Sequence, residues 1–255
     1  ENAYSNYRMN EAIKVVYDFV YKNFCDWYIE FSKSRFYGTD DKDRLVAQNI
    51  SVYVLKVILK LMHPFCPFIT EEIWSHFTKD SLLINSEWPN SNKKLIDKQT
   101  EKELLLIMSL ITSIRNIKAS FAISPKREIV LVCKTNNKKS KILSNYKNYL
   151  NRLVKVVDIS MGTDIKKPPK STTIIIDDME VYIPLEDLID IDKEIDRLEN
   201  QISNLKGRLN SVENKLNNKK FISNAPSEIV KHEKNKKNRY EKELLLLQNN
   251  LNSLK

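Results

Sequence analysis

The sequence predicts a mostly α-helical protein: an antiparallel helical bundle, a small α+β module, and a C-terminal antiparallel coiled-coil hairpin. Apolar residues recur at helical spacing through most of residues 1–124. Short β-branched runs gather between residues 125 and 185. An unbroken 3,4 spacing of apolar residues follows within residues 186–255. We therefore expect three domains with these boundaries.

Four helices are expected in the bundle. Apolar and aromatic residues at i+3 and i+4 spacing predict a long helix over residues 10–37 and a second over about 43–62. The second should end at His63, because the following proline disfavours helical backbone in the residue before it. Thr70 is the expected N-cap of a short third helix. A fourth helix spans about residues 99–120, and short connections make the bundle antiparallel.

The middle segment alternates short strands with one helix. Residues 128–134 are β-branched and predict a strand, and residues 138–152 predict a helix. Residues 154–159 predict a second strand. Residues 172–176 and 180–183 flank a short turn and predict a β-hairpin. This pattern is typical of a small α+β module.

Two heptad seams occupy the C-terminal segment. The first comprises Leu188, Ile191, Ile195, Leu198, Ile202, Leu205, Leu209, Val212 and Leu216. The second comprises Val230, Glu233, Lys237, Tyr240, Leu244, Leu247, Leu251 and Leu254. At ~1.5 Å per residue the first helix reaches roughly 43 Å. The short connection favours an antiparallel hairpin within one chain, and the alternative is a coiled coil between two chains.

The positive charge is concentrated in blocks. The chain carries a formal charge of +9, with 18 Lys and Arg against 9 Asp and Glu in residues 91–185. Residues 186–205 hold 2 against 7, whereas residues 206–242 hold 11 against 4. The hairpin is therefore negative at its root and positive towards its tip, which suits a polyanion such as an RNA backbone. The alternative is a random distribution of surface lysines.

The candidate phosphate contacts lie near the tip of the hairpin. They are Lys219, Lys220, Lys231, Lys234, Lys236, Lys237 and Arg239. Such contacts position a nucleic acid without reading its sequence.

Catalytic, metal and membrane functions have little support. Only three glycines are present, which leaves no Gly-rich loop for a nucleotide phosphate. His63 and Cys66 lack a second ligand pair, so we expect a packed turn and no metal site. We expect Cys25 in the core, and the three separated cysteines suggest a reducing compartment. No apolar run approaches the ~18–20 residues of a membrane span, and no signal peptide precedes Tyr4. The first residue, Glu1, suggests a piece of a longer protein.

Four motifs carry a family resemblance. Residues 63–74, HPFCPFITEEIW, resemble the signature of the anticodon-binding bundle of class Ia aminoacyl-tRNA synthetases. Residues 24–30, FCDWYIE, with Lys33, are similar to a helix of the valyl enzymes. Residues 114–119, IRNIKA, followed by Pro125, resemble the segment that closes that bundle. FISNAP at residues 221–226 resembles the hairpin loop of bacterial-type valyl-tRNA synthetases.

The resemblance implies a C-terminal fragment of that family, whose full enzyme attaches valine to tRNA(Val) with ATP and Mg²⁺ and edits threonine. Catalytic and editing domains and the first bundle helix would precede residue 1, so the fragment itself should need no cofactor and catalyse nothing. It also implies a cytoplasmic, monomeric parent and no membrane partner. The groove left by the absent helix could let the fragment associate with itself.

In the family the arm contacts the outer corner of tRNA, and Arg115, Asn116 and Lys118 occupy a position where the bundle could face the anticodon stem. The alternative for Arg115 is a buried salt bridge within the bundle. Two other functions remain open: a coiled-coil adaptor that binds protein, and the same region of a sister class Ia synthetase. Flat salt dependence of tRNA binding would favour the adaptor.

Overall fold

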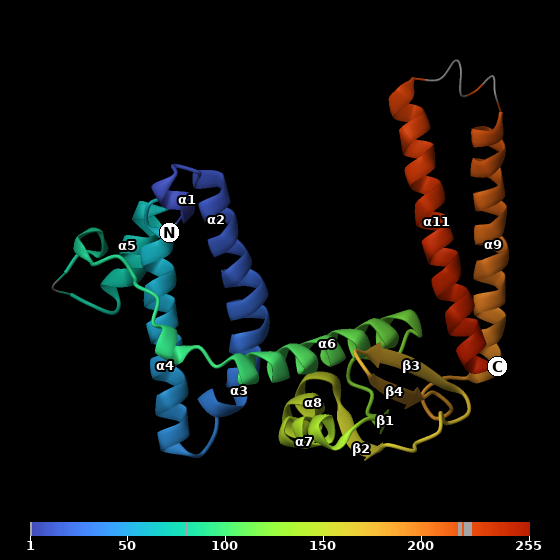
Figure 1. The fold of residues 1–255 in the computed structure, drawn as a ribbon, viewed down its shortest axis with the longest axis horizontal. Coiled ribbons are helices and arrows are strands. Elements are labelled where there is room, and N and C mark those ends of the chain that lie inside the picture. The colour runs from blue at the N-terminus through green and yellow to red at the C-terminus, as the bar shows by residue number, and fades with distance from the viewer. Residues whose placement is uncertain (1, 80, 219–220, 222–225) are drawn as a thin grey trace. The chain divides into compact units, whose positions relative to one another are not determined.

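The computed structural model describes residues 2–79, 81–218, 221 and 226–255. The chain forms two compact units, residues 1–98 and 99–255, which we call unit 1 and unit 2. Unit 1 is helical, whereas unit 2 combines a helix, a four-stranded sheet and a helical hairpin (Figure 1). The predicted mostly-α fold class with a small α+β module and a C-terminal hairpin is therefore confirmed.

Unit 1 is built from consecutive helices. Its elements are α1 (Asn2–Ser5), α2 (Met9–Asp18), the π-helical segment η1 (Phe19–Ile29), α3 (Glu30–Phe36), α4 (Asp41–Met62), α5 (Pro67–Ser75), and the 3₁₀ turns η2 (Leu83–Asn85) and η3 (Lys93–Leu95). The helix predicted over residues 10–37 is continuous through α2, η1 and α3, but its centre is π-helical. Hydrogen bonds from i to i+5 change which residues share a face. Within this segment Phe24 is buried, whereas Cys25, predicted to lie in the core, is exposed.

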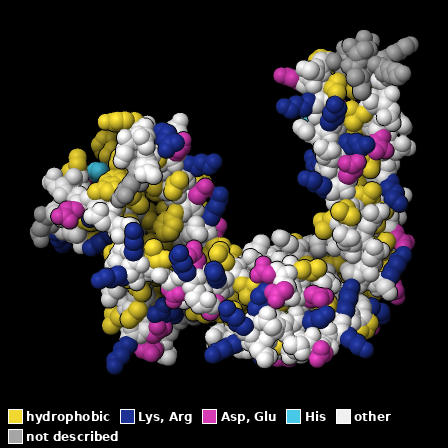
Figure 2. Space-filling model, in the orientation of Figure 1, with side chains coloured by type: hydrophobic (Ala, Val, Ile, Leu, Met, Phe, Trp, Pro, Cys, Tyr) yellow, Lys and Arg dark blue, Asp and Glu magenta, His cyan; other side chains and the backbone are white. Residues whose placement is uncertain are grey.

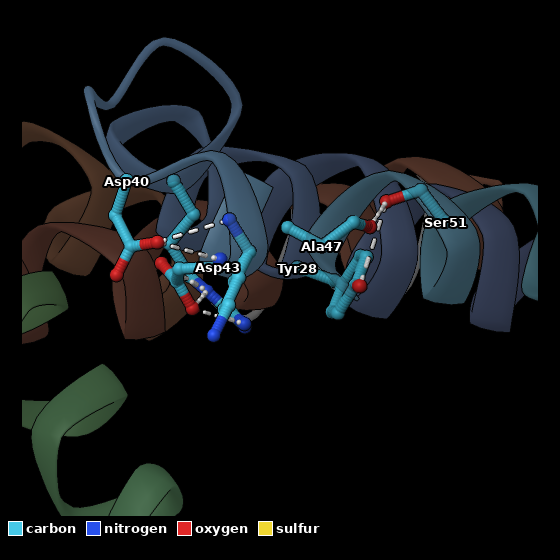
Figure 3. Close-up of polar contacts among 7 residues, drawn as sticks. Tyr28, Asp40, Asp43, Ala47 and Ser51 are labelled. Carbon is cyan, nitrogen blue, oxygen red and sulfur yellow. Dashed lines mark hydrogen bonds and ion pairs between the residues drawn. The ribbon is translucent and has the colours of Figure 1, made fainter. Parts of the chain in front are cut away.

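Helix α4 is fixed at its start by side chains that its neighbours supply (Figure 3). Asp40 is the N-cap and accepts hydrogen bonds from the backbone N–H groups of Lys42 at 2.9 Å and Asp43 at 3.2 Å. The Arg35 guanidinium pairs with the Asp43 carboxylate at 2.6 Å and holds the pKa of that carboxyl below its usual range. About two turns after Asp43, Ser51 donates to the Ala47 carbonyl at 2.7 Å.

Helix α5 begins four residues earlier than predicted, with Cys66 at the N-cap position. Pro67 occupies its first turn, where the fixed φ of proline suits a helix start, so Thr70 lies inside the helix and is not its N-cap. The Thr70 hydroxyl donates to the Cys66 carbonyl at 2.8 Å and lies 2.8 Å from the His63 imidazole Nδ1. Glu71 accepts a hydrogen bond from the Leu83 N–H at 2.7 Å. The motif at residues 63–74 therefore stabilises a packed turn.

Helix α4 is also more apolar than the sequence analysis expected. An 18-residue window of it has a mean hydropathy of 1.5, so by length and composition it could cross a membrane. Within unit 1, α4 contacts α2, α3 and α5. Only 17% of the window is buried, and Leu45, Val46, Ile50 and Tyr53 remain exposed. Figure 2 shows hydrophobic side chains gathered on unit 1.

Unit 2 contains the α+β module. Its elements before the hairpin are α6 (Lys98–Ser120), β1 (Ile129–Lys134), α7 (Asn137–Asn145), α8 (Lys147–Val154), β2 (Val156–Gly162), β3 (Ser171–Ile176) and β4 (Met179–Pro184). The sheet order is β2-β1-β4-β3, with β1 and β2 parallel and the other pairs antiparallel. The predicted strands and the β3–β4 hairpin are present, whereas the predicted helix over residues 138–152 is broken at Tyr146.

The unit to which α6 belongs differs from the domain in which we predicted it. We expected it to close the bundle of residues 1–124, but it belongs to unit 2. Its residues Leu106, Ile107, Leu110, Ile111 and Ile114 are buried. The end of the helix is tied to the module, because the Lys118 ammonium donates to the Val154 carbonyl at 2.9 Å. The unit boundary therefore falls at residue 98.

Candidate nucleic-acid interface

The hairpin of α9 (Ile191–Asn217) and α11 (Ser227–Leu254) is the scaffold of the candidate interface; we call it the arm. The two helices lie side by side (Figure 1) and contact each other along their length. Leu205, Val212 and Tyr240 form a buried cluster, with Leu209, Leu216, Leu244 and Leu247 packed against it. These are predicted seam residues, so the predicted intramolecular hairpin is confirmed.

Two seam positions of α11 are charged. Glu233 is 8% exposed, and its Oε2 atom is buried without a hydrogen-bond partner among the described residues. Its other oxygen lies 3.8 Å from the Lys215 ammonium on α9. Lys237 pairs with Glu213 on α9 at 2.9 Å and with Glu241 at 3.7 Å. These carboxylates raise the pKa of Lys237, chiefly through the hydrogen bond to Glu213.

The remaining predicted cations of the arm differ in their surroundings. Lys231 and Lys234 are exposed, and neither has an ion-pair partner within the described part of the chain. Lys236 and Arg239 lie over the ring of Tyr240, 5.9 Å and 5.4 Å from its centroid. Lys219 and Lys220 lie outside the described residues. Lys231 and Lys234 are therefore the predicted residues that hold the least compensated charge.

Four further cations belong to the basic block but were not named as contacts, and one of them, Lys215, lies near Glu233. Lys206 and Arg208 on α9 and Lys242 on α11 are exposed, again without an ion-pair partner among described residues. Lys231, Lys234 and Lys242 lie on one face of α11. Lys234 is three residues after Lys231, and Lys242 is eight residues after Lys234, or about two turns. We call these three residues the outer stripe. Figure 2 shows Lys and Arg side chains distributed along the arm.

Charged side chains at the root of the arm form ion pairs within the protein, so they are not candidate ligand contacts. Arg197 pairs with Glu194, which is 8% exposed, at 2.5 Å and donates to the Ser120 carbonyl of α6 at 3.2 Å. At the same end of the hairpin, Lys255 after α11 pairs with Glu199 of α9 at 2.9 Å. The acidic block of residues 186–205 thus contributes carboxylates that fasten the arm to itself and to α6.

The three candidates on α6 have separate environments. Lys118 is 4% exposed, and its ammonium donates to the carbonyls of Pro125, Arg127 and Val154 at 3.2, 2.6 and 2.9 Å. Burial lowers its pKa. With three carbonyls bound, Lys118 has no donor left for a phosphate, so we remove it from the candidate RNA contacts. Arg115 and Asn116 are exposed, which excludes the alternative of a buried salt bridge for Arg115.

Other chemistry-bearing residues serve the fold. His63 and Cys66 join the turn before α5 through Thr70, as described above. Trp74 is 6% exposed, and its indole N–H donates to the Ser81 carbonyl at 3.1 Å. The ammonium groups of Lys56 and Lys60 lie over its ring. Across the described residues, no group of three or more His, Cys, Asp or Glu side chains could hold a metal ion.

Comparisons with known proteins agree with this arrangement. Residues 1–133 match the family model described as the anticodon-binding domain of tRNA ligase. Residues 190–255 match the model described as the valyl tRNA synthetase tRNA binding arm. The second match coincides with the arm, and the first includes both unit 1 and α6.

Curated proteins similar to the chain are valine–tRNA ligases. That of Oceanobacillus iheyensis is 34% identical over 238 residues, which cover 92% of this chain and 27% of the relative. Those of Petrotoga mobilis and Bacillus subtilis are 37% and 33% identical and cover 89% and 92% of this chain, and 26% and 27% of the relatives. The chain thus spans about a quarter of the length of these relatives and corresponds to their C-terminal part.

Proposed function

Because the chain belongs to the family of anticodon-binding domains of tRNA ligases and carries the arm of the valyl members, we propose that it is the tRNA-binding C-terminal part of a valine–tRNA ligase. Its partner is tRNA(Val). The observation that supports this most directly is the outer stripe, because its three cations lie exposed on one helix face without neutralising carboxylates among the described residues. Such cations bind phosphates and release counterions, whichever bases are present.

The whole protein, in this proposal, attaches valine to tRNA(Val) with ATP and Mg²⁺ and removes mischarged threonine, in the cytoplasm and as a monomer. The residues described here offer neither a Gly-rich phosphate loop nor a group of acidic or imidazole side chains for a metal. In this proposal ATP and Mg²⁺ are bound by parts of the enzyme outside this chain. This chain contributes contacts to tRNA and no catalytic residue.

The test is a titration of the 255-residue chain with tRNA(Val) at several salt concentrations. Charge reversal of the outer stripe (Lys231→Glu, Lys234→Glu, Lys242→Glu) should weaken binding and reduce the slope of log K against log salt by about two to three, since each lost phosphate contact removes ~0.7–0.9. A non-cognate tRNA, run in parallel, reports whether any preference for tRNA(Val) resides in this part of the enzyme.

A matched control reverses three exposed lysines of the module, Lys126, Lys138 and Lys141. Both triple variants have the same net charge, so a difference between them reports position and not total charge. Equal losses in the two variants would contradict an arm-based interface. Binding with a flat salt dependence would instead favour the alternative of a protein-binding adaptor.

We also propose that the isolated chain associates with itself through unit 1. Val15 on α2 is 68% exposed, and Leu45, Val46, Ile50 and Tyr53 on α4 are exposed as well. Apolar surface of this extent tends to be covered by a partner. Sedimentation velocity should show a concentration-dependent dimer, and Val15→Glu with Ile50→Glu should abolish it. A monomer at all concentrations would contradict this part of the proposal.

A further inference from the structure

A hollow of about 620 Å³ lies where α6, β3 and α11 meet in unit 2. Its wall includes Asn116 of α6, Thr172 and Thr173 of β3, and Asn250 of α11, with Lys167 from the loop before β3. Helix α11 packs against β3 at this place, and Arg197 ties the arm to the end of α6. The hollow is therefore bounded by regular elements of one compact unit.

Two polar residues of this wall are almost buried. Asn250 is 9% exposed and Thr172 is 6% exposed. Neither side chain forms a hydrogen bond with any other described residue; the only bond at Asn250 is to its backbone carbonyl, from Ser253 at 2.7 Å. Their polar atoms are not enclosed by protein and remain accessible at the hollow, where water or a ligand can satisfy them. Here the free groups line the hollow.

Packing of the hairpin does not explain the asparagine. The seam of α11 continues through Leu247, Leu251 and Leu254, and Asn250 lies between these positions. Asn has a low helix propensity, and a leucine at a position this buried would stabilise the hairpin more. Asn250 therefore occupies a position where an apolar side chain would make the hairpin more stable.

The chemistry of the wall matches an unpaired nucleotide. Amide groups offer donors and acceptors in a fixed pattern that suits the edge of a base, and hydroxyl groups suit a ribose 2′-OH. Lys167 is exposed at the rim and can neutralise a phosphate, while Leu246, 55% exposed, offers an apolar surface to the face of a base. None of the described residues that line the hollow is Asp or Glu, so no carboxylate repels the phosphate.

We propose that this hollow binds one unstacked nucleotide of the bound tRNA, with Asn250 and Thr172 contacting the base and ribose. The inference rests on the proposed tRNA-binding function and adds a neutral, hydrogen-bonding subsite to the cationic contacts of the arm. Asn116, which the sequence analysis selected as an anticodon-side residue, contacts the same nucleotide. The hydrogen bonds of Asn250 and Thr172 contribute affinity that does not depend on salt, because these two groups carry no charge, whereas Lys167 at the rim adds a phosphate contact that does.

The experiment compares tRNA binding of the 255-residue chain with that of Asn250→Leu and Thr172→Val. Both substitutions keep the side-chain size and remove the hydrogen-bonding group. The double variant should bind tRNA(Val) roughly tenfold more weakly, with an unchanged slope of log K against log salt, since only hydrogen bonds are lost. Asn148→Leu, at an exposed position of α8 that does not line the hollow and is not on the arm, is the control and should leave the affinity unchanged.

The outcomes separate this inference from the proposed function. If reversal of the outer stripe weakens binding and the double variant does not, the arm interface stands and the nucleotide subsite is wrong. If the wild-type chain binds no tRNA, the proposed function fails and this inference fails with it. Circular dichroism melting checks folding. Should Asn250→Leu be unfolded, Thr172→Val alone decides, with a threefold or larger loss supporting the subsite and an unchanged affinity overturning it.

Discussion

Lys237 of α11 lies 2.9 Å from Glu213 of α9, across the seam of the arm. A second carboxylate, Glu241, lies 3.7 Å away on the same helix. The charge of Lys237 is therefore compensated within the hairpin, although Lys237 lies in the basic block of residues 206–242. Nearby Lys234 has no such partner among the described residues.

This difference predicts unequal effects of two similar mutations. Lys234→Met should reduce the slope of log K against log salt for tRNA binding by about 0.7–0.9, as expected for one phosphate contact. Lys237→Met should reduce it by much less, because the lysine that is removed was already neutralised by Glu213. Filter-binding titrations at four salt concentrations measure both slopes. A larger loss for Lys237→Met would show that the ion pair opens when RNA binds.

We predict that replacing Glu233 with an apolar residue stabilises the arm. Its side chain is buried on the seam with one oxygen unpaired among the described residues, and the nearest cation, Lys215, is 3.8 Å away. Glu233→Leu should stabilise the arm by about 1–3 kcal/mol, the usual cost of a buried unsatisfied polar group. Hydrogen exchange of the α11 amides measures the gain locally. Glu243→Leu, at an exposed position of the same helix, is the control and should change protection little.

Lys118 predicts a destabilising mutation. Lys118→Met keeps the aliphatic stem but leaves the carbonyls of Pro125, Arg127 and Val154 without their donor. The loss should be roughly 2–3 kcal/mol, since buried acceptors are left unpaired. Denaturant unfolding followed by circular dichroism measures it, with Lys126→Met, at an exposed position, as the control. Unchanged stability together with weaker tRNA binding would instead return Lys118 to the RNA contacts.

The arm could be predicted from the sequence because the residues that pack together recur at a regular spacing within two neighbouring segments. Leu205, Val212 and Tyr240 repeat at heptad spacing, and two such seams with a short connection leave few other arrangements. The same holds for the β3–β4 hairpin, whose two β-branched runs are almost adjacent in the chain. In both cases the residues that touch are specified by spacing alone.

The environment of Lys118 and Cys25 could not be predicted in this way. The motif at residues 114–119 places Lys118 on a helix, but its burial depends on the turn at Pro125 and on the end of α8, which lie elsewhere in the sequence. Cys25 was expected in the core because it lies close to Trp27 in the sequence, but proximity in the sequence does not specify which side of the helix a residue occupies, and Cys25 is exposed. Asn250 was missed because seam analysis counts apolar residues and passes over a buried amide between them.

Cys133 predicts a pH dependence of stability. It is fully buried on β1, and burial raises the pKa of its thiol from 9.0 to about 12. Between these two values the unfolded chain loses the thiol proton while the folded chain keeps it. The unfolded state then binds fewer protons, so stability falls as pH rises, by about 1.4 kcal/mol per pH unit from this group, and the contribution is intact below pH 9.

Lysines and tyrosines titrate in the same range, so the measurement compares the wild-type chain with Cys133→Val. The variant should lose stability less steeply between pH 9 and 11 in urea unfolding curves. Thiol labelling at pH 8 gives an independent check: exposed Cys25 should react at once, whereas Cys133 should react only as fast as β1 opens. Rapid labelling of Cys133 in the native chain would mean that β1, at the centre of the module, opens without global unfolding, and the module would then be a poor base for an arm that must hold RNA.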